Sequence, residues 1–138
     1  MRHPLHPAIV HFPVACWSLA VAADFASLWC GETAWRWSSG LLVVGCAMAA
    51  PAMLTGLLEL QHVPEGAAMR DAYAHMTAML TAFALFTTRL LLRLEHRQPL
   101  PPDAAALMLD AAAFLALTAG GWLGGRLVYG HGVGRERR

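Results

Sequence analysis

Histidine is the residue type whose positions in this chain point most directly to chemistry. The chain has seven histidines, and six of them lie at or near the ends of apolar segments: His3, His6, His11, His62, His75 and His131. A neutral imidazole ligates metal ions and haem iron, and it exchanges a proton near neutral pH. A fold that gathers these side chains would therefore create a metal site, a haem site or a proton-handling site.

The elements that must position these histidines are four apolar segments, residues 8–30, 37–60, 72–94 and 104–129. Each is long enough to cross the ~30 Å hydrocarbon layer of a bilayer as a helix, which takes ~20 residues. The chain of 138 residues is 57% hydrophobic and only 14% charged, whereas soluble domains carry roughly 25% charged residues. The sequence therefore predicts an all-α, integral membrane four-helix bundle with up-down-up-down topology, a single domain formed by residues 1–138.

Four crossings bring both termini to the same side of the membrane, called side A here. The six histidines then share side A, and only His96 falls on the opposite side B. Six arginines also fall on side A and four on side B, an excess that favours a cytoplasmic side A with both termini inside. The net charge of +1 gives no support for nucleic-acid binding.

Among these histidines, His11 and His75 are the pair best placed to bind one cofactor together. Each is expected near the side-A end of an odd-numbered helix, and the first and third helices of such a bundle lie diagonally across its core. Two imidazoles at equal depth on these helices would clamp one haem iron, so the sequence predicts one b-type haem bound by His11 and His75. The alternative is that both are interfacial histidines, one hydrogen-bonded and one hydrated.

Two arginines are candidates for binding the haem propionates. Arg126 is expected one turn inside the side-A end of the fourth helix, and Arg70 lies in the adjoining loop. Guanidinium groups bind carboxylates strongly. Arg126 could equally pair with Glu59 or Asp71 and only close the bundle.

Gly121 and Gly125 form one of two overlapping GxxxG patterns near the end of the fourth helix. Missing side chains allow close approach of a flat cofactor or of another helix, within the bundle or in a homodimer. Both glycines are therefore candidates for lining the cofactor.

Copper or zinc is the alternative ligand of the histidine cluster, because three imidazoles suit either metal. The candidate metal ligands are His3, His6, His11, His75 and His131. An oxygen ligand could come from Glu59, Glu65 or Asp71. Because Pro4 and Pro7 each follow a histidine, the opening residues are expected to form a stiff, non-helical arm that presents His3 and His6.

Charged residues inside the apolar segments form a second group, toward side B. Asp24, Arg89 and Asp110 are each expected ~8–10 Å inside the ends of their helices. Unpaired charges at that depth are costly, so the sequence predicts a buried ion-pair network with Arg93 as a second donor. A proton entry path is the functional alternative.

Three stretches of this chain carry a resemblance to a known family. They are the opening residues 3–15 (HPLHPAIVHFPVA), the group Arg70, Asp71 and His75, and the end of the chain, with Gly120-Gly121 and residues 127–134 (LVYGHGVG). Together they resemble the bacterial membrane family known as domain of unknown function 2231, over essentially the whole chain.

The resemblance implies a four-helix membrane protein of the bacterial inner membrane. Some members of the family are joined to Rieske or cytochrome c-like domains, which implies redox work, and the layout resembles small b-type cytochromes. Cytochromes of that kind with two haems have ligands at both ends of the bundle. Here side B offers only His96, so one haem at side A is expected.

Three functions follow from the sequence. The first is a membrane electron-transfer protein with one haem b and a redox protein docking at the histidine-rich face. The second is a copper- or zinc-handling membrane protein, and the third is a structural membrane subunit. The sequence holds no nucleophile triad, phosphate loop or HExxH motif that would indicate a hydrolase or a kinase.

Overall fold

The computed structural model describes residues 5–93 and 101–134. Four long helices follow one another: α1 (Leu5–Cys30), α2 (Glu32–Leu60), α3 (Ala67–Arg93) and α4 (Ala104–Gly125). A short π-helical turn, η1 (Arg126–Gly130), continues α4. The described residues contain no strand, and the predicted all-α four-helix architecture is confirmed.

Three of the helices begin earlier than the apolar segments suggested. α1 begins at Leu5 instead of residue 8, so His6 and Pro7 belong to its first turn rather than to an extended arm. A proline is tolerated there because the first N–H groups of a helix have no intrahelical partner. α2 and α3 each begin five residues early, at Glu32 and Ala67. Their first turns are polar or weakly apolar, so hydrophobicity alone did not reveal them.

Local signals set the boundaries between the helices. Gly31, with φ of 66°, is the whole turn between α1 and α2, and Gly66, with φ of 95°, precedes α3. These positive φ angles favour glycine, which has no Cβ to clash. At the start of α4 the carboxylate of Asp103 accepts a hydrogen bond of 2.7 Å from the backbone N–H of Ala106, as an N-cap residue does.

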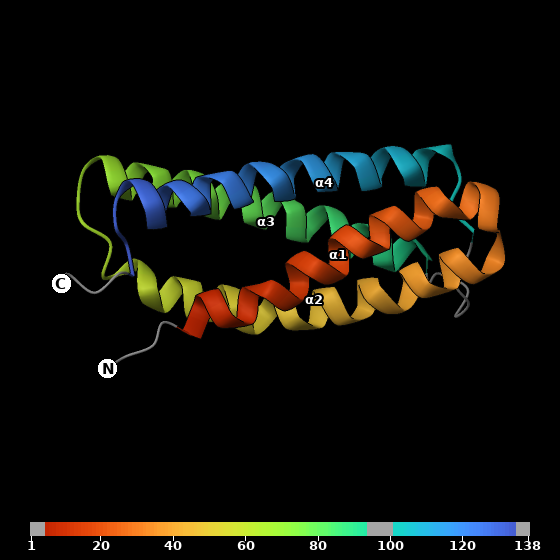
Figure 1. The fold of residues 1–138 in the computed structure, drawn as a ribbon, viewed down its shortest axis with the longest axis horizontal. Coiled ribbons are helices and arrows are strands. Elements are labelled where there is room, and N and C mark those ends of the chain that lie inside the picture. Colours follow the sequence, from red (N-terminus) through yellow and green to blue (C-terminus); the bar gives the residue numbers. More distant parts are fainter. Residues whose placement is uncertain (1–4, 94–100, 135–138) are drawn as a thin grey trace.

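The helices pair as two hairpins that pack on each other (Figure 1). The closest packing lies within the hairpins α1–α2 and α3–α4, and the hairpins meet through α2 against α3 and α1 against α4. α1 and α3 are therefore diagonal, as predicted. The beginning of α1 and the end of η1 lie at the same end of the bundle, as up-down-up-down topology requires (Figure 1).

The core is narrow and consists of a few large side chains among many small ones. The indole of Trp17 stacks on the ring of Phe86, with centroids 4.7 Å apart and planes 12° apart. Gly45 makes room for that indole, because a Cβ at this position would lie 2.6 Å from Cδ1 of Trp17. Leu42 and Leu117 fill the space around this stack.

The outer surface of the bundle is apolar, which is the reverse of a soluble bundle. Leu19, Leu54, Leu80 and Leu115 are all more than half exposed. All four helices are long and apolar enough to cross a membrane, with mean hydropathies from 1.3 to 2.1. The exposed side chains are therefore the surface that faces lipid, and the chain is a multi-pass membrane protein.

Candidate functional site

His6 is fixed in the first turn of α1 by two hydrogen bonds to α2. Its ring Nδ1 lies 2.8 Å from the carbonyl oxygen of Ala52, and its backbone N–H donates to Oε1 of Glu59 over 3.2 Å. A carbonyl oxygen only accepts, so Nδ1 carries the proton and Nε2 holds the lone pair. Gly56 lies beside the ring, since a Cβ there would be 3.0 Å from Cε1 of His6.

His75 is held in the same way by α4. Its Nδ1 donates to the carbonyl oxygen of Gly120 over 2.8 Å, which again leaves the lone pair on Nε2. Gly124 lies beside this ring, with a would-be Cβ 3.2 Å from Cε1. Because α3 begins at Ala67, His75 lies more than two turns inside the helix, deeper than the sequence suggested.

The imidazoles of His6 and His75 are neighbours inside the bundle. Their ring centroids are 6.4 Å apart and their planes are nearly perpendicular, at 84°. Both side chains are half-buried. Among the described residues, neither Nε2 atom has a hydrogen-bond partner. Two imidazoles from diagonal helices thus lie next to each other, and the Nε2 lone pair of each accepts no hydrogen bond from the described residues.

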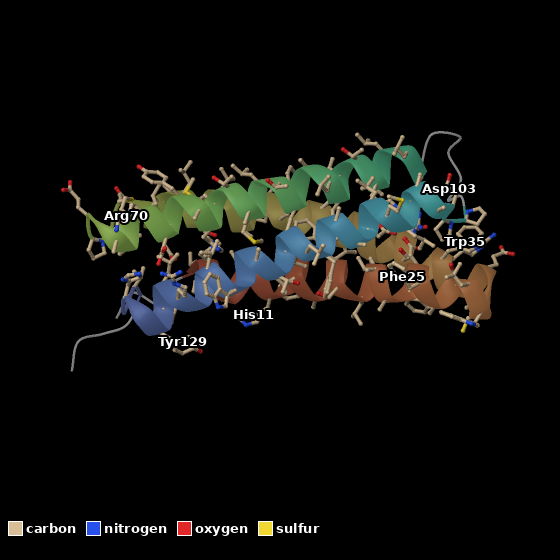
Figure 2. The ribbon with its side chains drawn as sticks, turned by 90° about the horizontal axis from the view of Figure 1, so that it is seen from above. His11, Phe25, Trp35, Arg70, Asp103 and Tyr129 are labelled. Carbon is tan, nitrogen blue, oxygen red and sulfur yellow. The ribbon has the colours of Figure 1, made fainter. Side chains whose placement is uncertain are left out.

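His11 does not take part in this pair, contrary to the expected His11–His75 clamp. It is exposed, and its side chain points away from the bundle (Figure 2). The reason is helical geometry. His11 follows His6 by five residues, which at 3.6 residues per turn places it about 140° further around the helix. Once His6 lies in the helix and faces the core, His11 must face outward.

Arg126 pairs with Asp71, one of the two acidic partners that the sequence left open. Nη2 of Arg126 lies 2.9 Å from Oδ2 of Asp71, and Nε2 of His131 lies 2.8 Å from the same oxygen. Asp71 precedes His75 by four residues and therefore lies one turn above it, toward the end of the bundle. Arg70 is exposed. The cluster joins α3 to η1 and to His131, which follows η1.

The predicted set of metal ligands does not come together among the described residues. His6 contacts His75, whereas His131 binds Asp71. Within residues 5–93 and 101–134, no group of three or more histidine, cysteine or acidic side chains has the arrangement of a metal site. His3 lies outside the described residues.

The glycines of α4 divide between two faces of the helix. Gly120 and Gly124 face α3, where a Cβ would lie 2.5 Å from Sδ of Met79 and 3.2 Å from the His75 ring, respectively. Gly121 and Gly125, the two predicted to line a cofactor, have no atom within 4 Å of a would-be Cβ. The inward pair of glycines is thus Gly120–Gly124, one residue out of step with the predicted pair.

The buried charge network toward side B is confirmed. One guanidinium, that of Arg89, binds both carboxylates, with Nη2 3.1 Å from Asp24 and Nε 3.1 Å from Asp110. Arg93 also pairs with Asp24. All four side chains are almost completely buried. Two positive charges thus meet two carboxylates, which satisfies each charge in a medium where an isolated one would be very costly.

The sequence did not reveal the part that α2 plays in this network. Nη1 of Arg93 donates to the hydroxyls of Ser38 and Ser39, over 2.8 and 3.1 Å, and to the carbonyl oxygen of Trp35, over 3.2 Å. These residues belong to the early turns of α2 that the apolar pattern placed at or outside the helix end. With them, all four helices contribute to the network.

Comparison with known proteins agrees with this architecture. No curated protein and no solved structure matches the chain. The family model described as "Predicted membrane protein (DUF2231)" matches residues 2–137, which is almost the entire chain. Four apolar membrane-spanning helices and a family model of this extent lead to one conclusion: the chain belongs to the DUF2231 family of predicted membrane proteins.

Proposed function

We propose that this protein binds one b-type haem between His6 and His75 and transfers electrons within the membrane. The observation that carries the proposal is that both imidazoles have the same tautomer and the same kind of hydrogen bond. Each donates its Nδ1 proton to a backbone carbonyl on a neighbouring helix, over 2.8 Å. Histidine ligands of metals are held in this way almost without exception, because the hydrogen bond fixes the tautomer and the ring orientation.

The spacing of the rings also suits a single iron. Two imidazoles bound to one ion at a metal–nitrogen distance of about 2 Å have their centroids roughly 6 Å apart, and the observed separation is 6.4 Å. Haem iron needs only two ligands from the protein, because the porphyrin supplies four. The described residues offer two imidazoles here, which is fewer than a structural zinc site requires.

A glycine lies beside each of the two imidazoles. Gly56 and Gly124 present no side chain beside the two rings. When bound, haem would supply reversible one-electron chemistry at the iron. His6 and His75 would hold it, and the exposed Arg70 is better placed than Arg126 to bind a propionate, because Arg126 is already paired with Asp71.

Copper is the second candidate, because the same two nitrogens could bind one Cu(I) ion. Imidazole is a good copper ligand, and a two-coordinate Cu(I) ion needs no ligand besides the two histidines. This alternative needs no space for a porphyrin. Haem and copper differ in colour, so one sample distinguishes them.

The proposal includes the setting of the protein. We place it in a bacterial inner membrane with side A in the cytoplasm, following the excess of arginine on that side. A redox protein docking at the histidine end and a homodimer remain predictions.

The test is an absorption spectrum of the detergent-solubilised protein, oxidised and dithionite-reduced, with metal analysis of the same sample. We expect a Soret band and sharp reduced α and β bands that disappear in His6→Ala and in His75→Ala. The matched controls are His11→Ala and His62→Ala, which remove exposed imidazoles and should leave the spectrum unchanged. A protein that stays colourless after haem addition contradicts the haem proposal. Stoichiometric copper that depends on His6 and His75 would then establish the second candidate.

A further inference from the structure

A shallow hollow opens on the outer side of the last turn of α4 and of η1, at the histidine end of the bundle. Its volume is about 530 Å³, and it is lined by Trp122, Gly125, Arg126, Tyr129 and Gly130. The rings of Trp122 and Tyr129 are largely exposed, at 63% and 79%. The hollow thus combines two aromatic rings with a guanidinium at the outer surface of the bundle.

The hollow lies next to the turn of α4 that contacts His75. Gly124 faces inward, where a Cβ would lie 3.2 Å from Cε1 of His75. Its neighbour Gly125 faces outward and lines the hollow. Adjacent residues of a helix point about 100° apart, so the hollow flanks the face of α4 that contacts His75.

The electrostatics of the hollow favour a neutral ligand with oxygen acceptors. The guanidinium of Arg126 lies over the Trp122 ring, 4.9 Å from its centroid, and its charge is balanced by Asp71 at 2.9 Å. Its N–H groups that do not bind Asp71 can donate to a carbonyl oxygen without an unmatched positive charge in the hollow. The largely exposed ring of Trp122 can stack on a flat ring. A phosphate would instead want a net positive site.

We infer that this hollow binds the ring of a membrane-soluble quinone and that His75 lies on the electron path between that ring and the iron. The inference rests on the proposed haem and names its electron donor or acceptor. In the direction of quinol oxidation, one quinol gives one electron to each of two ferric haems and two protons to water at side A, and it leaves as the quinone. The reverse direction balances in the same way.

The binding test does not depend on haem. A short-chain benzoquinone with a decyl tail is titrated into the protein in micelles, and quenching of tryptophan fluorescence is followed. We expect saturable quenching with a large contribution from Trp122, which Trp122→Phe would remove. Gly125→Leu places a side chain in the hollow from a position whose Cβ has no atom within 4 Å, and it should weaken binding roughly tenfold or more, the value of the lost ring contacts.

The matched control is Gly121→Leu, which adds the same side chain one turn earlier, on a face that is also open. It should leave quenching unchanged. Equal quenching in both leucine variants and the wild type would mean that the quinone only dissolves in the micelle, which overturns the inference. Displacement of the quinone by an anionic phospholipid that itself depends on Gly125 would overturn it as well, in favour of a lipid headgroup site.

The electron-transfer test uses the haem-loaded protein. The reduced form of the same quinone should reduce the haem, with a rate that falls roughly tenfold or more in Gly125→Leu and stays the same in Gly121→Leu. Reduction by dithionite should be equal in all three. A wild type with haem but without saturable quinone binding would overturn this inference and leave the proposed function intact. A wild type without haem would overturn the proposed function, while the fluorescence titration would still report on the hollow.

Discussion

Arg89 and Asp24, which are 65 residues apart in sequence, form an ion pair of 3.1 Å between side chains that are 4% and 1% exposed. The pair ties α3 to α1 across the diagonal of the bundle. In a membrane protein, the main effect of such a pair on stability is that removing one partner leaves the other as a buried, unpaired charge. A guanidinium without its carboxylate would be left buried where neither water nor lipid can solvate it.

Replacing Asp24 by Asn should therefore destabilise the protein strongly. The substitution keeps the size of the side chain but removes the charge that Arg89 and Arg93 share. Breaking one partner out of a buried ion pair costs about 3–5 kcal/mol. We expect a clearly lower unfolding midpoint in detergent.

The matched control for Asp24→Asn is Glu32→Gln. Glu32 forms a 2.6 Å ion pair with Arg36, but both side chains are more than 60% exposed, and exposed pairs contribute little. Its unfolding midpoint should be close to that of the wild type. Equal midpoints for the two variants would show that the buried network carries no stability.

Gly45→Ala should destabilise the core that lies between the histidine pair and the charge network. The new methyl group would lie 2.6 Å from Cδ1 of Trp17, so the indole or the helix must move. The indole cannot move freely because it stacks on Phe86. Overpacking of this kind costs about 1–3 kcal/mol, which thermal unfolding in detergent would detect.

Gly40→Ala provides the comparison for Gly45→Ala on the same helix. Position 40 has nothing within 4 Å of a new Cβ. Alanine there should be neutral or stabilise the helix, by about 0.5–1 kcal/mol. If both alanine variants unfold at the same midpoint, Trp17 does not pack against α2 as described.

Most of the fold was predictable because the bilayer permits few architectures. Segments of this length without polar alternation can only be helices, and an even number of crossings fixes the shared side of the termini. The helix starts were less predictable. Glu32 and Ala67 begin turns that extend beyond the apolar segments, and hydrophobicity carries no signal for a helix that continues past the hydrocarbon.

The sequence predicted that histidines gather at one end of the bundle, but not which two imidazoles lie next to each other. His75 was identified, whereas its neighbour proved to be His6 instead of His11. The bias of a proline against helix in the preceding residue argued for an extended arm, but the first turn of a helix tolerates that proline. A shift of three residues in the start of α1 thus decided which imidazole faces the core. Side-chain direction on a helix depends on such details, which the sequence pattern leaves open.

Gly124→Ala should perturb the ligand field at His75 without unfolding the protein. The added Cβ would lie 3.2 Å from Cε1 of the imidazole, so the ring must shift by a few tenths of an ångström. If His75 holds a haem, displacing its imidazole should change the reduced α band and the reduction potential. Gly121→Ala, on the open face of α4, should change neither. Identical spectra and potentials in both variants would contradict a role for His75 as a ligand.

The orientation of the protein can be read from its own cysteines. Cys30 ends α1 at side B and is exposed, whereas Cys16 and Cys46 lie half-buried inside the helices; all three are free thiols. If side A is cytoplasmic, a membrane-impermeant maleimide added to intact spheroplasts should label Cys30 and no other cysteine, and Cys30→Ser should abolish the labelling. Labelling that appears only after lysis would place side B in the cytoplasm. In that case the slight excess of arginine on side A would not have determined the insertion, and the histidine pair would lie toward the outer face of the membrane.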